Sequence, residues 1–232
     1  MHGKRTLAQG YSEKMTDIRP HENALREGRV MERLQHLSLM ICGCGALGGH
    51  YALAMARMGV SQFTLLDRDI VDWENMGSQP YGESDVGNPK VDALGELLSE
   101  ANPDGVWLKT FHSDVFKTAK PPWELIPHSA DLVIDAFDNR AARAWVTDVT
   151  EDLELPCLHL GMNGDFGSVV WDARYQVPVD LPELPDNCAH PFSLSLVYRI
   201  TSAAIEATCE FVDDYEDKVD YRVRGMEITR YG

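Results

Sequence analysis

Long apolar runs, a leader-like N-terminus and a regular cysteine pattern are all missing from this sequence. No stretch of about 18 apolar residues occurs, so no membrane-spanning helix is expected. Residues 1–29 have no apolar core of the length found in signal peptides. The five cysteines are odd in number and irregularly spaced, which makes a poor disulfide framework. Together these absences predict a cytoplasmic protein that does not use a membrane.

Positive charge is also scarce. The chain has 21 Lys and Arg against 37 Asp and Glu, a net charge of −16. A surface this acidic repels phosphate backbones, so no nucleic-acid partner is expected. Much of the positive charge gathers within residues 1–36, at Lys4, Arg5, Lys14, Arg19, Arg26, Arg29 and Arg33. Two interpretations of this basic segment stay open: a solvated surface, or an arm that reaches a phosphate site or a partner subunit.

Short apolar runs alternate with amphipathic segments along the chain. Strands are predicted over residues 37–42, 62–67, 105–111, 130–137, 155–161, 167–173 and 221–229. Helices are predicted over residues 22–37, 46–58, 90–101, 139–152 and 192–212, and a long loop over 68–89. This order predicts an α/β, Rossmann-like, doubly wound and mainly parallel sheet with helices on both faces. The later strands, ending in an edge strand, are expected to be antiparallel.

A glycine-rich turn, Gly43-Cys44-Gly45-Ala46-Leu47-Gly48, joins the first predicted strand to the helix that follows it. Gly43 permits a tight turn, Gly45 leaves the backbone open to a phosphate, and Gly48 lets the helix lie close to the sheet. The helix begins at Ala46, and its free N–H groups attract an anion. The turn therefore predicts a nucleotide site; a tight turn without a ligand is the alternative.

The second predicted strand ends at Asp67, where a carboxylate can accept hydrogen bonds from ribose hydroxyls. NAD and ATP both remain possible ligands at this point. Polar residues then follow in the order Asp67, Asp69, Val71, Asn75, Met76, Gln79, Gly87, Lys90, Asp135, Asp138, Asn139 and Arg143. This order resembles the MoeB/ThiF/ubiquitin-activating (E1-like) adenylyltransferase family. The resemblance runs from about Arg19 to Cys209, most of the chain.

The resemblance implies an enzyme that uses ATP and Mg²⁺ to adenylate the C-terminal carboxylate of a partner protein. The partner would be a small ubiquitin-like or sulfur-carrier protein with a flexible tail. A carboxylate that attacks a phosphate brings two anions together, so cations and N–H groups must offset their repulsion. By this resemblance, Lys90 would contact the phosphates, Asp138 would bind Mg²⁺, and Asp67 beside Asp69 would bind the ribose. Asn75 and Gln79 would order the phosphate loop. Asn139 and Arg143 would support the turn that carries Asp138.

Each of these residues also has an ordinary structural interpretation. Lys90 would then be a solvated lysine in the first turn of a helix. The pair Asp138-Asn139 would be only a helix N-cap, which both residue types favour. Asp135 would simply bond the backbone at the end of its strand.

One position departs from the family pattern. Ser78 stands where the family's Asn-Leu-x-Arg-Gln segment has arginine, and the loss of a phosphate-facing guanidinium weakens transition-state stabilisation. A catalytically degenerate partner-binding or dimerisation module is therefore the main alternative function. Arg19 lies close to where the family has an arginine that crosses a homodimer interface to the partner's ATP. We predict that role for Arg19, with an exposed residue in a mobile arm as the alternative.

The cysteines divide into two groups. Many family members bind zinc with two Cys-x-x-Cys pairs, and this chain has none, so no zinc site is expected. Packing roles are predicted for Cys42, Cys44, Cys157 and Cys209. Cys188, two residues before His190, lies in a proline-rich segment that corresponds to the family's crossover loop. It is a candidate to accept the acyl group as a thioester or persulfide adduct, with an unreactive loop thiol as the alternative.

We therefore expect one ThiF-type adenylation domain over residues 1–232. It comprises an N-terminal arm and helix (1–36), a nucleotide-binding core (37–180), and a crossover loop, long helix and C-terminal strand (181–232). A downstream conjugating enzyme is a further candidate partner. Two other functions stay open: ATP-dependent modification of a small molecule or RNA, and an NAD-dependent oxidoreductase.

Overall fold

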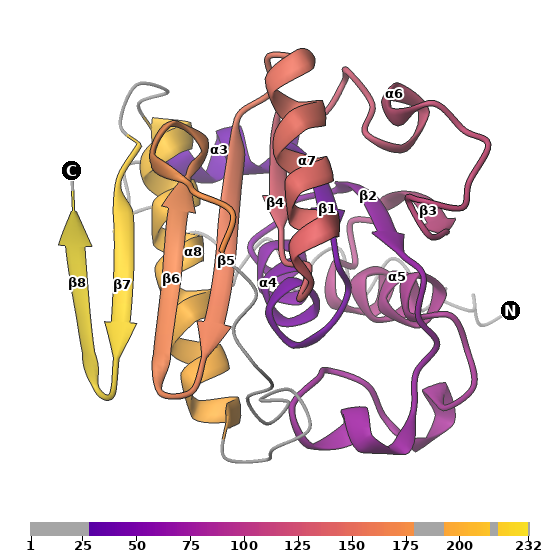
Figure 1. Ribbon diagram of the computed structural model, residues 1–232. Coiled ribbons are helices and arrows are strands. Elements are labelled where there is room, and N and C mark those ends of the chain that lie inside the picture. The colour runs from indigo at the N-terminus through magenta and orange to yellow at the C-terminus, as the bar shows by residue number, and fades with distance from the viewer. Residues whose placement is uncertain (1–27, 179–192, 214–217, 232) are drawn as a thin grey trace, which may run out of the picture.

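The computed structural model describes residues 28–178, 193–213 and 218–231 (Figure 1). Eight strands form one sheet in the order β3-β2-β1-β4-β5-β6-β7-β8. Their bounds are β1 (Ser38–Cys42), β2 (Gln62–Asp67), β3 (Trp107–His112), β4 (Leu132–Asp135), β5 (Cys157–Asn163), β6 (Phe166–Trp171), β7 (Asp220–Arg224) and β8 (Glu227–Tyr231). The first five strands run parallel, and β6, β7 and β8 join antiparallel. The predicted α/β fold class is confirmed.

Helices cover both faces of the parallel part of the sheet. They are α3 (Arg29–His36), α4 (Ala46–Arg57), α5 (Lys90–Ala101), α6 (Pro122–Leu125), α7 (Arg140–Asp152) and α8 (Leu194–Asp213). Leu39 and Ile41 of β1 pack into a core with α3, α4, α5 and α8, whereas Met40 and Cys42 pack into a second core with α6 and α7. Figure 1 shows α7 in front of the sheet and α4 and α8 behind it. Strands buried on both faces explain the uninterrupted apolar runs of the sequence.

The strand order reverses beside β1. From β1 the chain first moves outward through β2 to β3, and then returns to place β4 on the other side of β1. Cys42 lies opposite Leu66 on one side and Asp135 on the other, so the loops after β1, β2 and β4 leave the sheet side by side. Such a reversal opens a crevice beyond the carboxyl ends of the strands, and ligands of doubly wound sheets bind there.

The prediction of a single strand over residues 221–229 is wrong. The chain reverses within it, between β7 and β8, and Gly225 adopts a φ of +56° in the turn. A two-residue hairpin loop needs positive φ, which glycine adopts without strain. The long loop after β2 also contains two short 3₁₀ helices, η1 (Trp73–Gly77) and η2 (Glu83–Asp85). No helix among the described residues is long and apolar enough to cross a membrane.

Candidate functional site

The glycine loop after β1 is shaped by two close backbone approaches and one open side. Gly43 has a φ of +96°, and a Cβ there would lie 2.8 Å from the carbonyl oxygen of Ala136. A Cβ at Gly48 would lie 1.9 Å from the carbonyl oxygen of Gly43. At Gly45, by contrast, a Cβ would meet nothing within 4 Å. Packing accounts for the first two glycines, and the open space beside Gly45 leaves room for a ligand.

The N-terminus of α4 faces the same opening. Gly45 is the N-cap of this 12-residue helix, so no capping side chain bonds to the amides of the first turn. Amides left in this way at a helix N-terminus carry a partial positive charge and bind anions such as phosphate. The loop therefore fits the phosphates of a nucleotide.

Asp67, at the end of β2, holds the glycine loop. Its Oδ2 accepts a hydrogen bond from the Cys44 N–H at 2.6 Å, and its Oδ1 accepts one from the Asp69 N–H at 2.9 Å. The side chain is only 6% exposed. Burial raises the pKa of Asp67 above its usual range, although the two N–H donors partly offset that rise. Asp67 thus joins the loops that follow β1 and β2; its contact with a ribose stays a prediction.

Lys90 lies at the same edge and is buried, with an exposure of 7%. Its Nζ lies 3.2 Å from Oδ2 of Asp69, and its N–H donates to the Asp69 carbonyl at 3.0 Å. The interpretation of Lys90 as a solvated lysine is therefore wrong. The Tyr81 hydroxyl bonds the Cys44 carbonyl and lies 3.3 Å from the Lys90 carbonyl, so it ties α5 to the glycine loop.

The turn after β4 presents Asp138 to solvent at the start of α7. Asn139 caps this helix, because its Oδ1 accepts a hydrogen bond from the Ala142 N–H at 2.9 Å. Its Nδ2 also donates to Oδ1 of Asp138 at 3.4 Å. Asn139 is thus the N-cap, and the Asp138 carboxylate remains exposed. An exposed carboxylate suits Mg²⁺, which keeps several waters and binds proteins through one or two carboxylates besides substrate phosphates.

Asp135 stands at the end of β4 and is fully buried. Its Oδ1 accepts a hydrogen bond from the Phe137 N–H at 3.2 Å, as its structural interpretation expected. Its Oδ2 lies 2.8 Å from Nδ1 of His159 and 3.6 Å from Nη1 of Arg143. Arg143 therefore supports the turn through Asp135.

The segment around η1 holds the remaining predicted residues. Asn75 accepts a hydrogen bond from the Asp72 N–H at 2.8 Å and so closes the start of η1. Gln79 is buried, and its Oε1 has no hydrogen-bond partner among the described residues. Ser78, in the position of the family arginine, is 1% exposed, and its carbonyl oxygen lies 3.1 Å from Nε2 of His50. Arg19 and Cys188 lie outside the described residues.

Four cysteines lie in the described part of the chain, and all four are buried: Cys42, Cys44, Cys157 and Cys209. Burial raises the thiol pKa of Cys42, Cys44 and Cys157 well above the ordinary value. A thiol that stays protonated is a poor nucleophile, so these three residues have the packing role that their sequence context predicts.

The part of the chain that carries this site matches a known family. The model of the ThiF family aligns with residues 11–177. The chain belongs to the ThiF family. Within that span lie the glycine loop, Lys90 and Asp138, and all three are described by the structure.

Individual ThiF-family relatives agree in sequence and fold. The chain is 34% identical to sulfur carrier protein ThiS adenylyltransferase of Bacillus subtilis over 139 residues, 59% of this chain and 40% of the relative. It is 26% identical to ubiquitin-like modifier-activating enzyme 5 of Arabidopsis thaliana over 179 residues, 70% of this chain and 42% of the relative. The chain thus spans about two fifths of the length of these relatives. A crystal structure of E. coli MccB with MccA-N7isoAsn has the same fold, with a TM-score of 0.69 and 17% identity over 87% of this chain and 65% of MccB.

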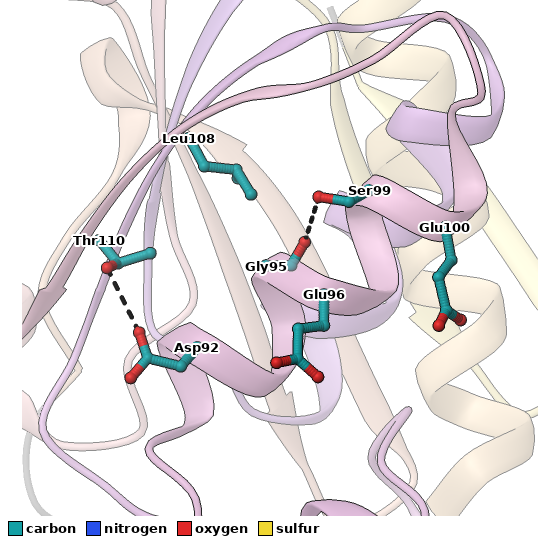
Figure 2. A pocket seen from close by; sticks show the side chains of 7 residues that line it. All are labelled: Asp92, Gly95, Glu96, Ser99, Glu100, Leu108 and Thr110. Atoms are coloured by element: carbon teal, nitrogen blue, oxygen red, sulfur yellow. Dashed lines mark hydrogen bonds between the residues drawn. The ribbon is translucent and has the colours of Figure 1, made fainter.

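A hollow of about 460 Å³ between α5 and β3 lies apart from the glycine loop (Figure 2). Asp92, Glu96 and Glu100 line it at successive turns of α5. The Thr110 hydroxyl donates to Asp92 at 3.4 Å, as Figure 2 shows. Three carboxylates on one wall repel a triphosphate, so this hollow is unfavourable for a nucleotide.

Proposed function

We propose that this chain binds Mg-ATP at the carboxyl edge of β1, β2 and β4 and adenylates the C-terminal carboxylate of a small carrier protein. The carrier is a ubiquitin-like or sulfur-carrier protein whose flexible tail reaches the site. One observation carries the proposal: hydrogen bonds of Asp67, Asp69 and Tyr81 gather the open glycine loop and the buried Lys90 at one edge. Membership of the ThiF family favours ATP over NAD there.

The residues at this edge can offset the negative charge of the phosphates and of the attacking carboxylate. An oxygen of the tail carboxylate attacks the α-phosphorus, the bond to the β-phosphate oxygen breaks, and acyl-adenylate and pyrophosphate form. The first-turn amides of α4 and the Lys90 ammonium offset negative charge on the phosphates. Asp138 would hold the Mg²⁺, which supplies further positive charge beside the phosphates. Asp67, Asn75, Gln79 and Asn139 keep the loops in place, and Asp67 with Asp69 binds the ribose.

Two features of the proposed enzyme concern residues outside the described ranges. In a homodimer, Arg19 crosses the subunit interface and contacts the ATP bound by the other subunit. Cys188 accepts the acyl group from the adenylate, with AMP as the leaving group, before a downstream conjugating enzyme acts. A cytoplasmic location fits the role of Cys188, because thiols remain reduced there.

ATP–pyrophosphate exchange with the matching carrier tests the proposal. The unmodified chain should exchange label only when the carrier is present, and Lys90→Met should lower this exchange about 100-fold. A carrier that ends one residue short of its natural C-terminus is the matched control and should support no exchange. An unmodified chain that binds neither ATP nor carrier would overturn the proposal.

The buried Ser78 in the arginine position favours one second candidate, a partner-binding module without turnover. In that case the carrier binds but no exchange occurs, and Lys90→Met leaves the affinity for the carrier unchanged. Measuring exchange and carrier affinity on the same preparations therefore separates the two functions.

A further inference from the structure

A buried polar network lies under the turn that presents Asp138. Asp135 is 0% exposed, His159 1% and Arg143 8%. Asp135 and His159 are direct neighbours in the β4–β5 register, and Nδ1 of His159 lies 2.8 Å from the Asp135 carboxylate. Arg143 reaches the same oxygen from α7, at 3.6 Å. A buried carboxylate needs such partners, because an unpaired charge in the core is strongly unfavourable.

The network extends beyond this carboxylate to β5 and to the segment after β6. Arg143 donates from Nη2 to the Leu160 carbonyl at 2.6 Å and from Nη1 to the Tyr175 hydroxyl at 3.1 Å. The Tyr175 ring stacks on His159, with centroids 3.5 Å apart and planes 3° apart. Asp135 lies on β4, Arg143 on α7, His159 and Leu160 on β5, and Tyr175 after β6, so the network joins four parts of the chain around the Asp135 carboxylate.

The other oxygen of Asp135 bonds the turn that follows β4. It accepts a hydrogen bond from the Phe137 N–H at 3.2 Å. The neighbouring Ala136 donates from its N–H to the Cys42 carbonyl at 2.8 Å, and its own carbonyl lies against Gly43. Residues 136 and 137 therefore connect the network on one side to the glycine loop and on the other to Asp138.

We infer that Arg143 and His159 are positioning residues for Asp138. They fix Asp135, and Asp135 fixes the turn at 136–138 so that the Asp138 carboxylate and the glycine loop face the same nucleotide. This inference rests on the proposed function, because it assigns Asp138 to the metal that accompanies ATP. Both residues act through the Asp135 carboxylate, and Arg143 also interacts electrostatically with Asp138.

The two substitutions His159→Asn and His159→Leu test the inference on the full chain. Both remove the ring that stacks on Tyr175, but Nδ2 of asparagine occupies nearly the place of Nδ1 and keeps the donor to Asp135. Calorimetry measures ATP affinity with Mg²⁺ and again with EDTA. The ratio of the two affinities is the metal-dependent gain in ATP affinity. Thermal unfolding of each variant monitors the fold separately.

We expect His159→Leu to lower the metal-dependent gain about tenfold, the equivalent of one hydrogen bond to a charged group. Its affinity without metal should stay within about twofold of the unmodified chain, and His159→Asn should recover most of the gain. If His159→Leu does not fold, Tyr175→Phe takes its place, because it keeps the stacked ring and removes only the hydroxyl that Arg143 bonds. A smaller loss of about threefold is expected there, since Arg143 retains Asp135 and Leu160.

A merely structural network gives a different result. His159→Leu would then lower the melting temperature and leave the metal-dependent gain unchanged, or it would weaken ATP binding equally with and without Mg²⁺. Either outcome overturns the inference and leaves the proposed function intact. An unmodified chain that binds no ATP overturns the proposed function and this inference together.

Discussion

Asp67 accepts the Cys44 N–H at 2.6 Å, so the carboxylate that ends β2 holds the glycine loop that follows β1. The same carboxylate also accepts the Asp69 N–H, and Asp69 in turn pairs with Lys90. Three segments distant in sequence are thereby joined at one edge through the side chains of Asp67 and Asp69. The proposed nucleotide site is consequently preformed by contacts within the protein.

This arrangement gives Asp67 a defined effect on stability. Burial raises its pKa in the folded chain, so the folded state keeps this proton at pH values where the unfolded state has lost it. Because the folded state then binds more protons, the free energy of unfolding should fall as pH rises from about 4 through the folded pKa of Asp67. Asp67→Asn should flatten this part of the curve in urea unfolding, whereas Glu74→Gln, at an exposed residue of η1, should not. An equal slope in both variants would contradict the prediction.

Alanine substitution at two glycines of this loop should have different effects, one on stability and the other on ATP affinity. Gly48→Ala places a Cβ 1.9 Å from a backbone oxygen and should destabilise the fold by about 3 kcal/mol or more. Gly45→Ala meets no atom within 4 Å and should leave the melting temperature nearly unchanged. The new methyl stands where a phosphate must approach, however, so ATP affinity should fall at least about tenfold. If Gly45→Ala binds ATP normally, the phosphates of ATP do not lie against the backbone at Gly45.

Lys90→Met separates the charge of Lys90 from its packing. The methionine side chain fills the buried volume of the lysine stem, so the loss of stability should stay below about 1.5 kcal/mol. ATP–pyrophosphate exchange should nevertheless fall by about 100-fold, since the cation beside the phosphates is gone. The matched control is Lys117→Met, because the Lys117 side chain is 82% exposed and lies on the loop after β3. Comparable exchange by both variants would exclude Lys90 from the reaction.

Thiol labelling tests whether the buried cysteines are protected in the folded chain. Because burial holds the pKa of Cys42, Cys44 and Cys157 well above the ordinary value, the native chain should not be alkylated by iodoacetamide at these positions at pH 7.5. Mass spectrometry after a brief pulse should find label there only when urea is added. Rapid labelling of Cys44 in the native chain would show that the glycine loop opens in solution.

The sequence predicted most of the carboxyl edge, because its signals are local. Each of these signals can be recognised from a few neighbouring residues. They are the spacing of the glycines, the carboxylate that ends β2, and the residues around Lys90 and around Asp138-Asn139. Because the carboxyl ends of parallel strands meet at one edge of the sheet, the loops that carry these residues are predicted to lie together. The helix bounds also follow from local patterns, as α5 and α7 illustrate.

His159 and Tyr81 were missed for the opposite reason. His159 meets Asp135 only through the register of β4 and β5, and the spacing of 24 residues gives no hint of that pairing. Tyr81 lies in a polar loop, and its hydroxyl finds carbonyl partners at Cys44 and Lys90 only after the loop folds back. The hairpin at Gly225 was missed because one glycine within an alternating strand pattern is also compatible with a continuous strand.

The close approach of the Ala136 carbonyl to Gly43 makes the two halves of the edge inseparable. Any side chain gained at residue 43 would push away the β4 turn, and with it the carboxylate at its tip. The proposed phosphate-binding loop and the proposed metal ligand are therefore mechanically coupled, and a single methyl group added between them would displace both at once.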